Sequence, residues 1–325
     1  MKNEDTRPVA LALVGPTGVG KTELSLGLAR ELDAEIVGLD SMQIYRGMDI
    51  GTAKPSPEEQ SLVPHHMIDI LPLTAEYTVA DYKRDAEAVL DEITARGKLP
   101  LLVGGTGMYL NALRYDQSYG GVSSDPDFRA EMHALADSPG GKTKLHKLLE
   151  EADPEAAARL HENDVRRVIR ALEVARDEEG DTTPTMQPGK YRIFAYGLTL
   201  PREMLYERID RRTDRMIQLG LREEVRGLLA AYPEETWGSA RQAIGYKEMI
   251  EHLHGGIPEE EAIRLIARNS RRYAKRQMTW FTRDPMITWY DASGYESAAA
   301  LQEALLSKAR MDLSAAKCNQ NETGE

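Results

Sequence analysis

Cysteine is almost absent from this chain, whose 325 residues include a single one, Cys318, in a polar stretch near the carboxyl end. A single cysteine excludes an internal disulfide and a zinc site built from cysteines, and it is typical of the reducing cytoplasm. No apolar run approaches the roughly 18 residues that a membrane-spanning helix needs. Residues Met1–Pro8 are polar and charged, so we expect no signal peptide, a cytoplasmic location and no membrane partner.

Positive charge is in deficit, with 41 Lys and Arg against 53 Asp and Glu and a net charge of −12. This balance would argue against binding to nucleic acid if the charges were spread evenly. Residues 262–283, however, contain no acidic residue, and several of their basic residues are four apart, as on one side of a helix. We expect them to bind RNA, and the alternative is a solvated helix face that pairs with carboxylates. These residues are Arg264, Arg268, Arg271, Arg272, Lys275, Arg276 and Arg283.

What the chain does contain is a phosphate-binding loop at residues 15–22. The sequence Gly-Pro-Thr-Gly-Val-Gly-Lys-Thr fits the pattern G-x-x-x-x-G-K-[ST] at every fixed position. The apolar run Val9–Val14 predicts a buried strand before the loop, and the amphipathic run Thr22–Leu32 predicts a helix after it. The residues expected to bind a diphosphate or triphosphate are Gly15, Pro16, Thr17, Gly18, Val19, Gly20, Lys21 and Thr22.

Each part of this loop has a physical role. Glycines let successive backbone N–H groups curl around an anion, and the N-terminus of the following helix adds its dipole. Lys21 neutralises charge and the Thr22 hydroxyl can hold a metal ion, so Mg²⁺ is the expected cofactor. The motif is shared with ATP-binding proteins, but no guanine-reading Asn-Lys-x-Asp motif follows, which argues against a GTPase.

Two further motifs are predicted to meet the loop. The run Glu35–Leu39 predicts a second parallel strand that ends at Asp40, and Leu99–Val103 predicts a third that ends in the Gly-Gly-Thr-Gly sequence of residues 104–107. Ligands of a doubly wound sheet bind beyond the carboxyl ends of its strands, so the three motifs should converge on one crevice. There Asp40 can cap the next turn, bind magnesium or act as a general base.

The order of the predicted elements indicates an α/β fold, a P-loop-type parallel sheet core with flanking helices, plus an all-helical insertion domain. The core should gain strands at Tyr191–Leu200 and Met286–Tyr290. The expected limits are 7–120 and 190–313 for the discontinuous core, 121–189 for the insertion and 314–325 for a disordered tail. The expected helices of the insertion are Asp127–Leu135, Lys142–Leu149, Pro154–Leu160 and Val165–Arg176.

Beyond the phosphate loop, several stretches carry a more specific pattern. They are Asp40-Ser41-Met42-Gln43-Ile44-Tyr45, Gly47-Met48-Asp49-Ile50-Gly51-Thr52-Ala53-Lys54-Pro55, Gly104-Gly105-Thr106-Gly107-Met108-Tyr109, Asp164–Ala175, Gly245-Tyr246 and Lys275-Arg276-Gln277-Met278-Thr279-Trp280-Phe281. In this order and at this spacing, over about residues 7 to 290, they resemble the bacterial tRNA dimethylallyltransferase family.

The resemblance implies transfer of a five-carbon dimethylallyl group from dimethylallyl diphosphate to the adenosine immediately 3′ of a tRNA anticodon. The acceptor would be the exocyclic amino nitrogen, and diphosphate would be released. That nitrogen is a poor nucleophile because its lone pair is delocalised into the ring, so the resemblance implies Asp40 as a general base. The residues carried over as catalytic are Asp40, Thr17, Lys21 and Arg212.

The same resemblance implies a tRNA partner, bound at its anticodon stem-loop, and we expect the protein to be a monomer. Base flipping would bring the adenosine into the pocket near Thr106. Gln43 is placed to read a neighbouring base, since a glutamine amide can pair bidentately with adenine. The expected tRNA-binding residues are Asp40, Ser41, Met42, Gln43, Thr106, Arg129, Arg166, Arg167, Val168, Ile169, Arg170, Gln242, Ala243, Ile244, Gly245, Tyr246 and Lys247.

Two other functions fit part of the pattern. A nucleotide or small-metabolite kinase would share the phosphate loop, Asp40 and magnesium, but it would not need the basic residues beyond residue 260. An RNA-dependent ATPase, or an RNA-binding module without transfer chemistry, would use the loop and the basic residues. Phosphate transfer from ATP, or ATP hydrolysis stimulated by tRNA, would distinguish these functions from prenyl transfer.

Overall fold

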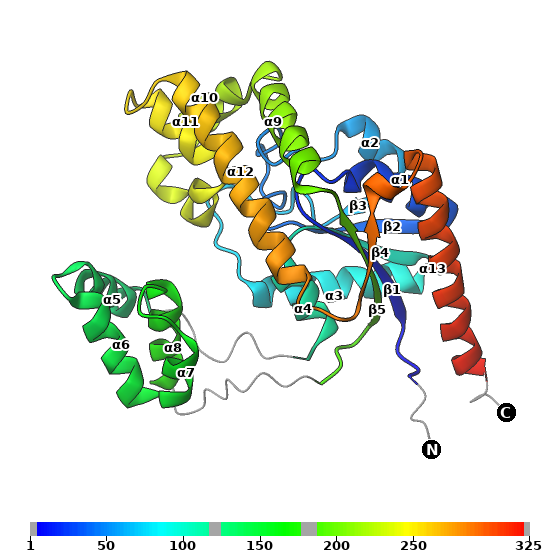
Figure 1. Cartoon of the computed structure of the whole chain (residues 1–325), viewed down its shortest axis with the longest axis horizontal. Coiled ribbons are helices and arrows are strands. Elements are labelled where there is room, and N and C mark those ends of the chain that lie inside the picture. The colour runs from blue at the N-terminus through cyan, green and yellow to red at the C-terminus, as the bar shows by residue number, and fades with distance from the viewer. Residues whose placement is uncertain (1–4, 117–124, 177–186, 322–325) are drawn as a thin grey trace. The chain divides into compact units, whose positions relative to one another are not determined.

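The computed structural model describes residues 5–116, 125–176 and 187–321, and Figure 1 labels its elements. The chain forms two compact units, one of Met1–Asp116 with Pro188–Glu325 and the other of Gln117–Gln187. Each unit has its own hydrophobic core. Residues 120 and 121, where we expected the insertion to begin, lie outside the described residues.

Six parallel strands form the sheet of the larger unit, in the order β3-β2-β4-β1-β5-β6. Their inner strands are nearly continuous apolar runs because both faces of the sheet are covered. The predicted parallel α/β sheet is therefore confirmed, with its predicted strands in place. The strands are β1 (Val9–Val14), β2 (Ala34–Leu39), β3 (His65–His66), β4 (Leu99–Gly104), β5 (Arg192–Thr199) and β6 (Ile287–Asp291).

The edge strand β3 was not predicted from the sequence. It is two residues long and half-buried, and it pairs with Ile36 and Val37 of β2. A strand this short has neither an apolar run nor an alternation that could reveal it.

Helices cover both faces of the sheet. Leu11 of β1 enters a core shared with α1 and α13, and the next residue, Ala12, enters a core shared with α3 and α4. This alternation follows from the two-residue period of a strand. The helices of this unit are α1 (Lys21–Glu31), α2 (Pro57–Leu62), α3 (Val79–Ala95), α4 (Gly107–Arg114), α9 (Arg202–Gln218), α10 (Leu221–Ala231), α11 (Tyr246–Leu253), α12 (Glu259–Phe281) and α13 (Ala298–Asn321), with short 3₁₀ turns at Glu234–Thr236, Gly238–Gln242 and Ala292–Gly294.

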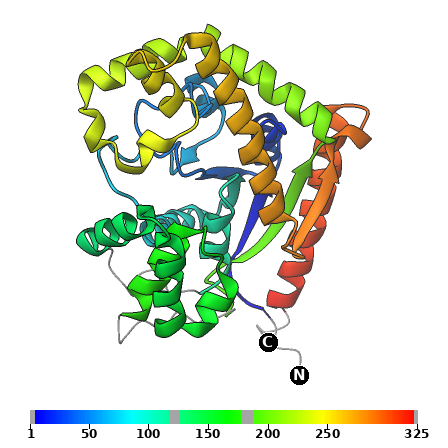
Figure 2. The same cartoon turned by 60° about the vertical axis from the view of Figure 1, so that its left-hand side comes forward.

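A third core joins the chain after β2 to the helices α9 to α12. Tyr45, Trp237 and Tyr246 are its large, fully buried side chains. Both views of the molecule show α12 running beside α9 and α11 (Figures 1 and 2). This packing holds α9, α12 and the chain after β2 around a common space beyond the carboxyl ends of the strands.

The smaller unit contains the four helices that the sequence predicts. Leu145, Leu149, Val168 and Ile169 form its buried centre. Asp153 caps α7 by accepting a hydrogen bond from the backbone N–H of Ala156. The helices are α5 (Pro126–Asp137), α6 (Gly141–Ala152), α7 (Pro154–Arg159) and α8 (Val165–Ala175).

We expected a disordered tail from residue 314. That prediction is wrong for residues 314–321, because α13 continues to Asn321. Leu305, Ala309 and Ala316 lie on one side of this helix and are buried. Asp312 also accepts a hydrogen bond from the Tyr196 hydroxyl of β5 at 2.9 Å. Two of these three buried residues are alanines, which are only weakly hydrophobic. The apolar pattern was therefore too weak to predict the last part of the helix. None of the described helices has the length and hydropathy of a membrane span.

Candidate active site

A cavity of about 750 Å³ opens beyond the carboxyl ends of β1, β2 and β4. The phosphate loop contributes Thr17, Lys21 and Thr22, the turn after β2 contributes Asp40, and the turn after β4 contributes Gly105. The structure thus brings together the three motifs that the sequence placed at one edge of the sheet. Residues of α9, α11 and α12 complete the walls.

The phosphate loop curls tightly around the Lys21 side chain. Gly18 and Gly20 have φ values of 83° and 103°, which disfavour any residue with a Cβ atom. The Lys21 Nζ donates to the carbonyl oxygens of Gly15 at 2.9 Å and Pro16 at 2.8 Å. Burial lowers the pKa of Lys21 to about 7, and nearby Arg212 lowers it further than Asp40 raises it. The ammonium is therefore held in place, but its charge is only marginally retained at neutral pH.

Arg212 comes from α9 and reaches the loop from the opposite wall. Its Nη1 donates to the Thr17 Oγ1 at 2.6 Å, and its Nη2 donates to the Thr52 carbonyl at 3.4 Å. Burial lowers the pKa of this guanidinium, and the Asp40 carboxylate opposes that shift. A second cation thus lies beside the phosphate loop.

Asp40 caps the turn after β2 and also lines the cavity. Its Oδ1 accepts hydrogen bonds from the backbone N–H groups of Met42 at 2.8 Å and Gln43 at 3.3 Å. Its Oδ2 accepts none from the described residues. Burial raises the pKa of Asp40, while those two N–H groups and the cations Lys21 and Arg212 oppose the rise. One oxygen is therefore structural, and the other is available to a ligand.

The Gly-Gly-Thr turn is tied to the Asp40 turn through Thr106. The Thr106 Oγ1 accepts a hydrogen bond from the Ser41 backbone N–H at 3.3 Å. Tyr273 of α12 lies beside them, and burial together with the Asp40 charge raises its pKa to about 12. The turn that holds Thr106 and the turn that holds Asp40 are therefore joined directly, although Thr106 itself does not line the cavity.

The cavity wall at residues 49–54 is clamped by Glu224 of α10. Its carboxylate accepts hydrogen bonds from three successive backbone N–H groups, of Asp49 at 3.1 Å, Ile50 at 2.8 Å and Gly51 at 3.3 Å. It also accepts one from the Tyr246 hydroxyl at 2.6 Å. Sequence reasoning missed Glu224, because an acidic residue in an ordinary helix gives no sign of a partner so far along the chain.

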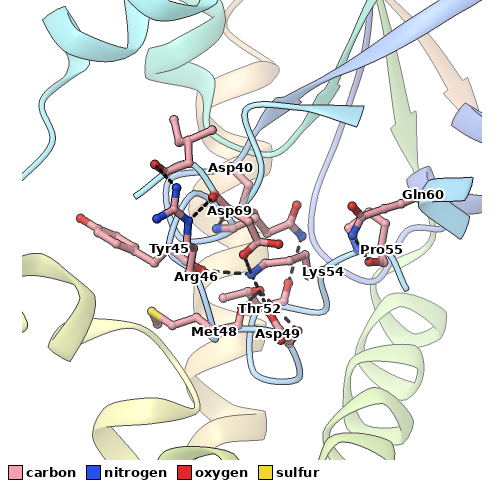
Figure 3. A network of polar contacts seen from close by, with 12 residues as sticks. Asp40, Tyr45, Arg46, Met48, Asp49, Thr52, Lys54, Pro55, Gln60 and Asp69 are labelled. Carbon is pink, nitrogen blue, oxygen red and sulfur yellow. Dashed lines mark hydrogen bonds and ion pairs between the residues drawn. The ribbon is translucent and has the colours of Figure 1, made fainter. Parts of the chain in front are cut away.

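A polar network holds the other end of the same wall (Figure 3). The Lys54 Nζ, whose side chain is only 3% exposed, donates to Asp49 at 2.6 Å, to Asp69 at 2.5 Å and to the Tyr45 carbonyl at 3.0 Å. Gln43 donates through its Nε2 to the carbonyls of residues 52 and 53, both at 3.2 Å. Because its amide hydrogens are used in this way, Gln43 can pair bidentately with an adenine only if these bonds break.

The expected tRNA-binding residues divide into exposed and buried groups. In the smaller unit Arg166 and Arg167 are exposed, but the side chains of Val168 and Ile169 are in its core, so they cannot contact RNA there. Tyr246 is also fully buried. The expected residues that line the cavity of the larger unit are Asp40, Ser41, Met42, Gln43, Gln242, Ala243, Ile244 and Lys247.

Arg129 and Arg170 both bind the buried carboxylate of Glu173. Arg129 does so through two hydrogen bonds of 2.7 and 2.8 Å, and Arg170 through one of 3.1 Å. Glu173 also accepts a hydrogen bond from the backbone N–H of Asp125. Both arginines therefore have a structural role in the smaller unit, whatever they contact in RNA.

The basic stretch of α12 has two kinds of arginine. Arg264 pairs with Glu261 at 2.6 Å and Arg271 pairs with Asp210. Arg272 and Arg276 line the cavity, and neither is paired with a carboxylate of the described residues. The alternative, a solvated helix face that pairs with carboxylates, therefore describes Arg264 and Arg271. It does not describe Arg272 and Arg276.

Comparisons with known proteins identify relatives of this chain. The sequence model of the IPP transferase family matches residues 43–284. A tRNA dimethylallyltransferase of Carboxydothermus hydrogenoformans is 45% identical over 304 residues, covering 92% of this chain and 96% of its own. That of Bacillus licheniformis is 48% identical over 292 residues, covering 88% and 91%.

Solved structures give the same result. The full-length tRNA isopentenylpyrophosphate transferase of Bacillus halodurans is 41% identical with a TM-score of 0.74, covering 97% of this chain and 100% of its own. A eukaryotic dimethylallyltransferase, whose crystallographic snapshots show it acting on tRNA, is 27% identical with a TM-score of 0.72, covering 92% and 78%. The chain therefore belongs to the IPP transferase family of enzymes.

Proposed function

We propose that this enzyme transfers a dimethylallyl group from dimethylallyl diphosphate to the exocyclic amino nitrogen of the tRNA adenosine immediately 3′ of the anticodon. The main support is one cavity that holds a diphosphate-type loop, an available carboxylate oxygen and unpaired arginines of α12. The relatives named as tRNA dimethylallyltransferases support the same reaction.

Asp40 acts as the general base in this proposal. The new bond joins the amino nitrogen to the allylic carbon while the bond from that carbon to the diphosphate oxygen breaks. The amino nitrogen loses a proton in the process, and the free Oδ2 of Asp40 accepts it. Because the Oδ1 is fixed by the Met42 and Gln43 backbone, the carboxylate is already oriented before substrate binds.

The phosphate loop stabilises the departing diphosphate. Lys21, the Thr17 hydroxyl and Arg212 face the negative charge that grows as the bond breaks. The described residues contain no group of three His, Cys, Asp or Glu side chains able to bind a metal alone. A magnesium ion would therefore be held by the Thr22 hydroxyl and by diphosphate and water oxygens, which suits its preferences. When bound, it would neutralise charge on the diphosphate.

A reaction with the full chain, tRNA, dimethylallyl diphosphate and Mg²⁺ tests the proposal. Diphosphate should be released only when tRNA is present, and ATP should be neither needed nor consumed. Phosphate transfer from ATP to a small acceptor would instead favour a kinase. Hydrolysis of ATP that depends on tRNA, without prenyl transfer, would favour an RNA-dependent ATPase.

The pKa of Lys21 predicts how diphosphate binding depends on pH. Since burial lowers that pKa to about 7, the ammonium is charged below pH 7 and loses its proton as the pH rises through that value. Wild type should therefore bind inorganic diphosphate most tightly, relative to Lys21→Met, below about pH 7, and the advantage should shrink above it. Calorimetric titrations of both proteins across this range measure the ratio, and Lys21→Met corrects for titration of the ligand itself. A constant ratio would contradict the prediction.

The unpaired arginines of α12 predict a change in salt dependence. If Arg272 and Arg276 bind RNA phosphates, the double variant Arg272→Ala/Arg276→Ala should bind tRNA more weakly. The log–log salt slope should lose about 0.7 in magnitude for each lost contact to single-stranded RNA. The matched control is Arg264→Ala/Arg271→Ala, which changes the net charge equally on the same helix but removes paired arginines. Equal slopes in the two variants would remove Arg272 and Arg276 from the RNA surface.

A further inference from the structure

One buried amide connects α12 to two of the three motifs around the cavity. Gln277 is 6% exposed. Its Oε1 accepts a hydrogen bond from the Thr17 backbone N–H of the phosphate loop at 2.8 Å. Its Nε2 donates to the Gly105 carbonyl of the Gly-Gly-Thr turn at 3.0 Å. One side chain thus bridges the phosphate loop and the turn that holds Thr106.

The bridge is specific for an amide. Its two partners require one acceptor and one donor on the same short side chain, and glutamine supplies both. A glutamate of the same length would accept from Thr17 but place a carboxylate oxygen against the Gly105 carbonyl. Gly105 has no side chain for a related reason, since a Cβ atom there would overlap the Gln277 Nε2. The contact therefore requires a glutamine at position 277 and favours a glycine at position 105.

Thr17 is held from two sides as a result. Gln277 binds its backbone N–H, and Arg212 binds its Oγ1 at 2.6 Å. The Thr17 amide is consequently not one of the N–H groups that can face a phosphate. Its hydroxyl, by contrast, is held beside Arg212 in the phosphate loop, and its position depends on where Gln277 lies.

The same stretch of α12 carries the unpaired cations, which line the same cavity as Gln277. Arg272 and Arg276 are exposed and line the cavity, while Gln277 is buried one residue further along α12. Helix α12 is continuous over Glu259–Phe281. A displacement of Arg276 therefore also moves Gln277, the next residue of the helix, which contacts Thr17. When such a connection couples two binding sites, each ligand changes the affinity for the other by the same factor.

We propose that Gln277 is a positioning residue that sets the phosphate loop and couples diphosphate binding to RNA binding on α12. The RNA part of this inference rests on the proposed function. RNA bound to Arg272 and Arg276 fixes α12, the Gln277 amide then fixes Thr17 and Gly105, and diphosphate binds a loop that is already ordered. Diphosphate in turn tightens RNA binding by the same factor.

The test is calorimetry of the full chain with inorganic diphosphate and Mg²⁺, with and without an anticodon stem-loop RNA. Wild type should bind diphosphate more tightly when RNA is present. In Gln277→Leu, diphosphate affinity should fall about tenfold, as expected for loss of hydrogen bonds to buried groups. The effect of RNA should disappear, while the affinity for RNA alone stays within about twofold of wild type. Thr279→Ala, an exposed change on the same helix, should behave as wild type.

A second variant keeps the inference testable if Gln277→Leu does not fold. In Gln277→Glu the carboxyl can donate to the Gly105 carbonyl only when protonated, so its deficit in diphosphate affinity relative to wild type should shrink as the pH falls. Unchanged diphosphate affinity and unchanged coupling in both variants would overturn the inference. Failure of wild type to transfer a prenyl group would overturn the proposed function alone, because the diphosphate measurements do not require turnover.

Discussion

Replacing Asp40 by asparagine is expected to lower the rate of prenyl transfer by about 10² or more while leaving tRNA binding intact. Asparagine keeps an oxygen that can accept the Met42 and Gln43 N–H bonds, so the turn after β2 should survive. It loses the oxygen able to take a proton. Single-turnover rates at saturating tRNA and donor, with tRNA affinity measured separately, check this result.

The pH profile strengthens the same test. A base must be ionised, so the wild-type rate should fall as the pH falls through the pKa of Asp40, which burial raises above the ordinary aspartate value. The residual rate of Asp40→Asn should lack this acid limb. Glu59→Gln removes one negative charge from another residue of the cavity and should keep both the rate and the profile. Near-normal turnover of Asp40→Asn would exclude Asp40 as the base.

Replacing Lys21 by alanine should lower kcat/KM for dimethylallyl diphosphate by about 10² or more, the usual effect of removing one donor that stabilises developing charge. The Lys21 ammonium is fixed by the carbonyls of Gly15 and Pro16, so it is already placed where the diphosphate charge grows. The KM for tRNA should change little, since the RNA is expected on α12. Initial rates with each substrate varied in turn measure both parameters.

The control for this change is Lys98→Ala, which also removes one positive charge. Lys98 pairs with Asp33 at 2.5 Å and does not line the cavity. Its kinetic parameters should match those of wild type. If Lys21→Ala kept the wild-type kcat/KM for the donor, the loop would not bind the diphosphate, and the proposed orientation of the donor would be wrong.

The sequence predicted those parts of the structure that depend on local pattern. The apolar runs of β1, β2 and β4 place their carboxyl ends together in any parallel sheet, so Lys21, Asp40 and Gly105 could be expected in one crevice. The helices of the smaller unit were also predicted, because capping residues and the spacing of apolar residues are signals within a short stretch of sequence.

Contacts between distant residues were not predictable in this way. Gln277 meets Thr17 across 260 positions, and Glu224 meets Ile50 across 174. Neither glutamine nor glutamate in a helix signals which backbone it will bind, because that depends on how α10 and α12 pack in three dimensions. The same is true of Glu173, whose pairing with Arg129 and Arg170 no local pattern indicates.

The most direct test of the central claim is mass spectrometry of nucleosides from tRNA incubated with the full chain, dimethylallyl diphosphate and Mg²⁺. The proposal predicts one added five-carbon unit on a single adenosine, mapped by nuclease fragments to the position immediately 3′ of the anticodon. Asp40→Asn should leave that adenosine unmodified over the same interval. Unmodified tRNA after incubation with active, folded wild type, or a unit added at another nucleoside, would contradict the account.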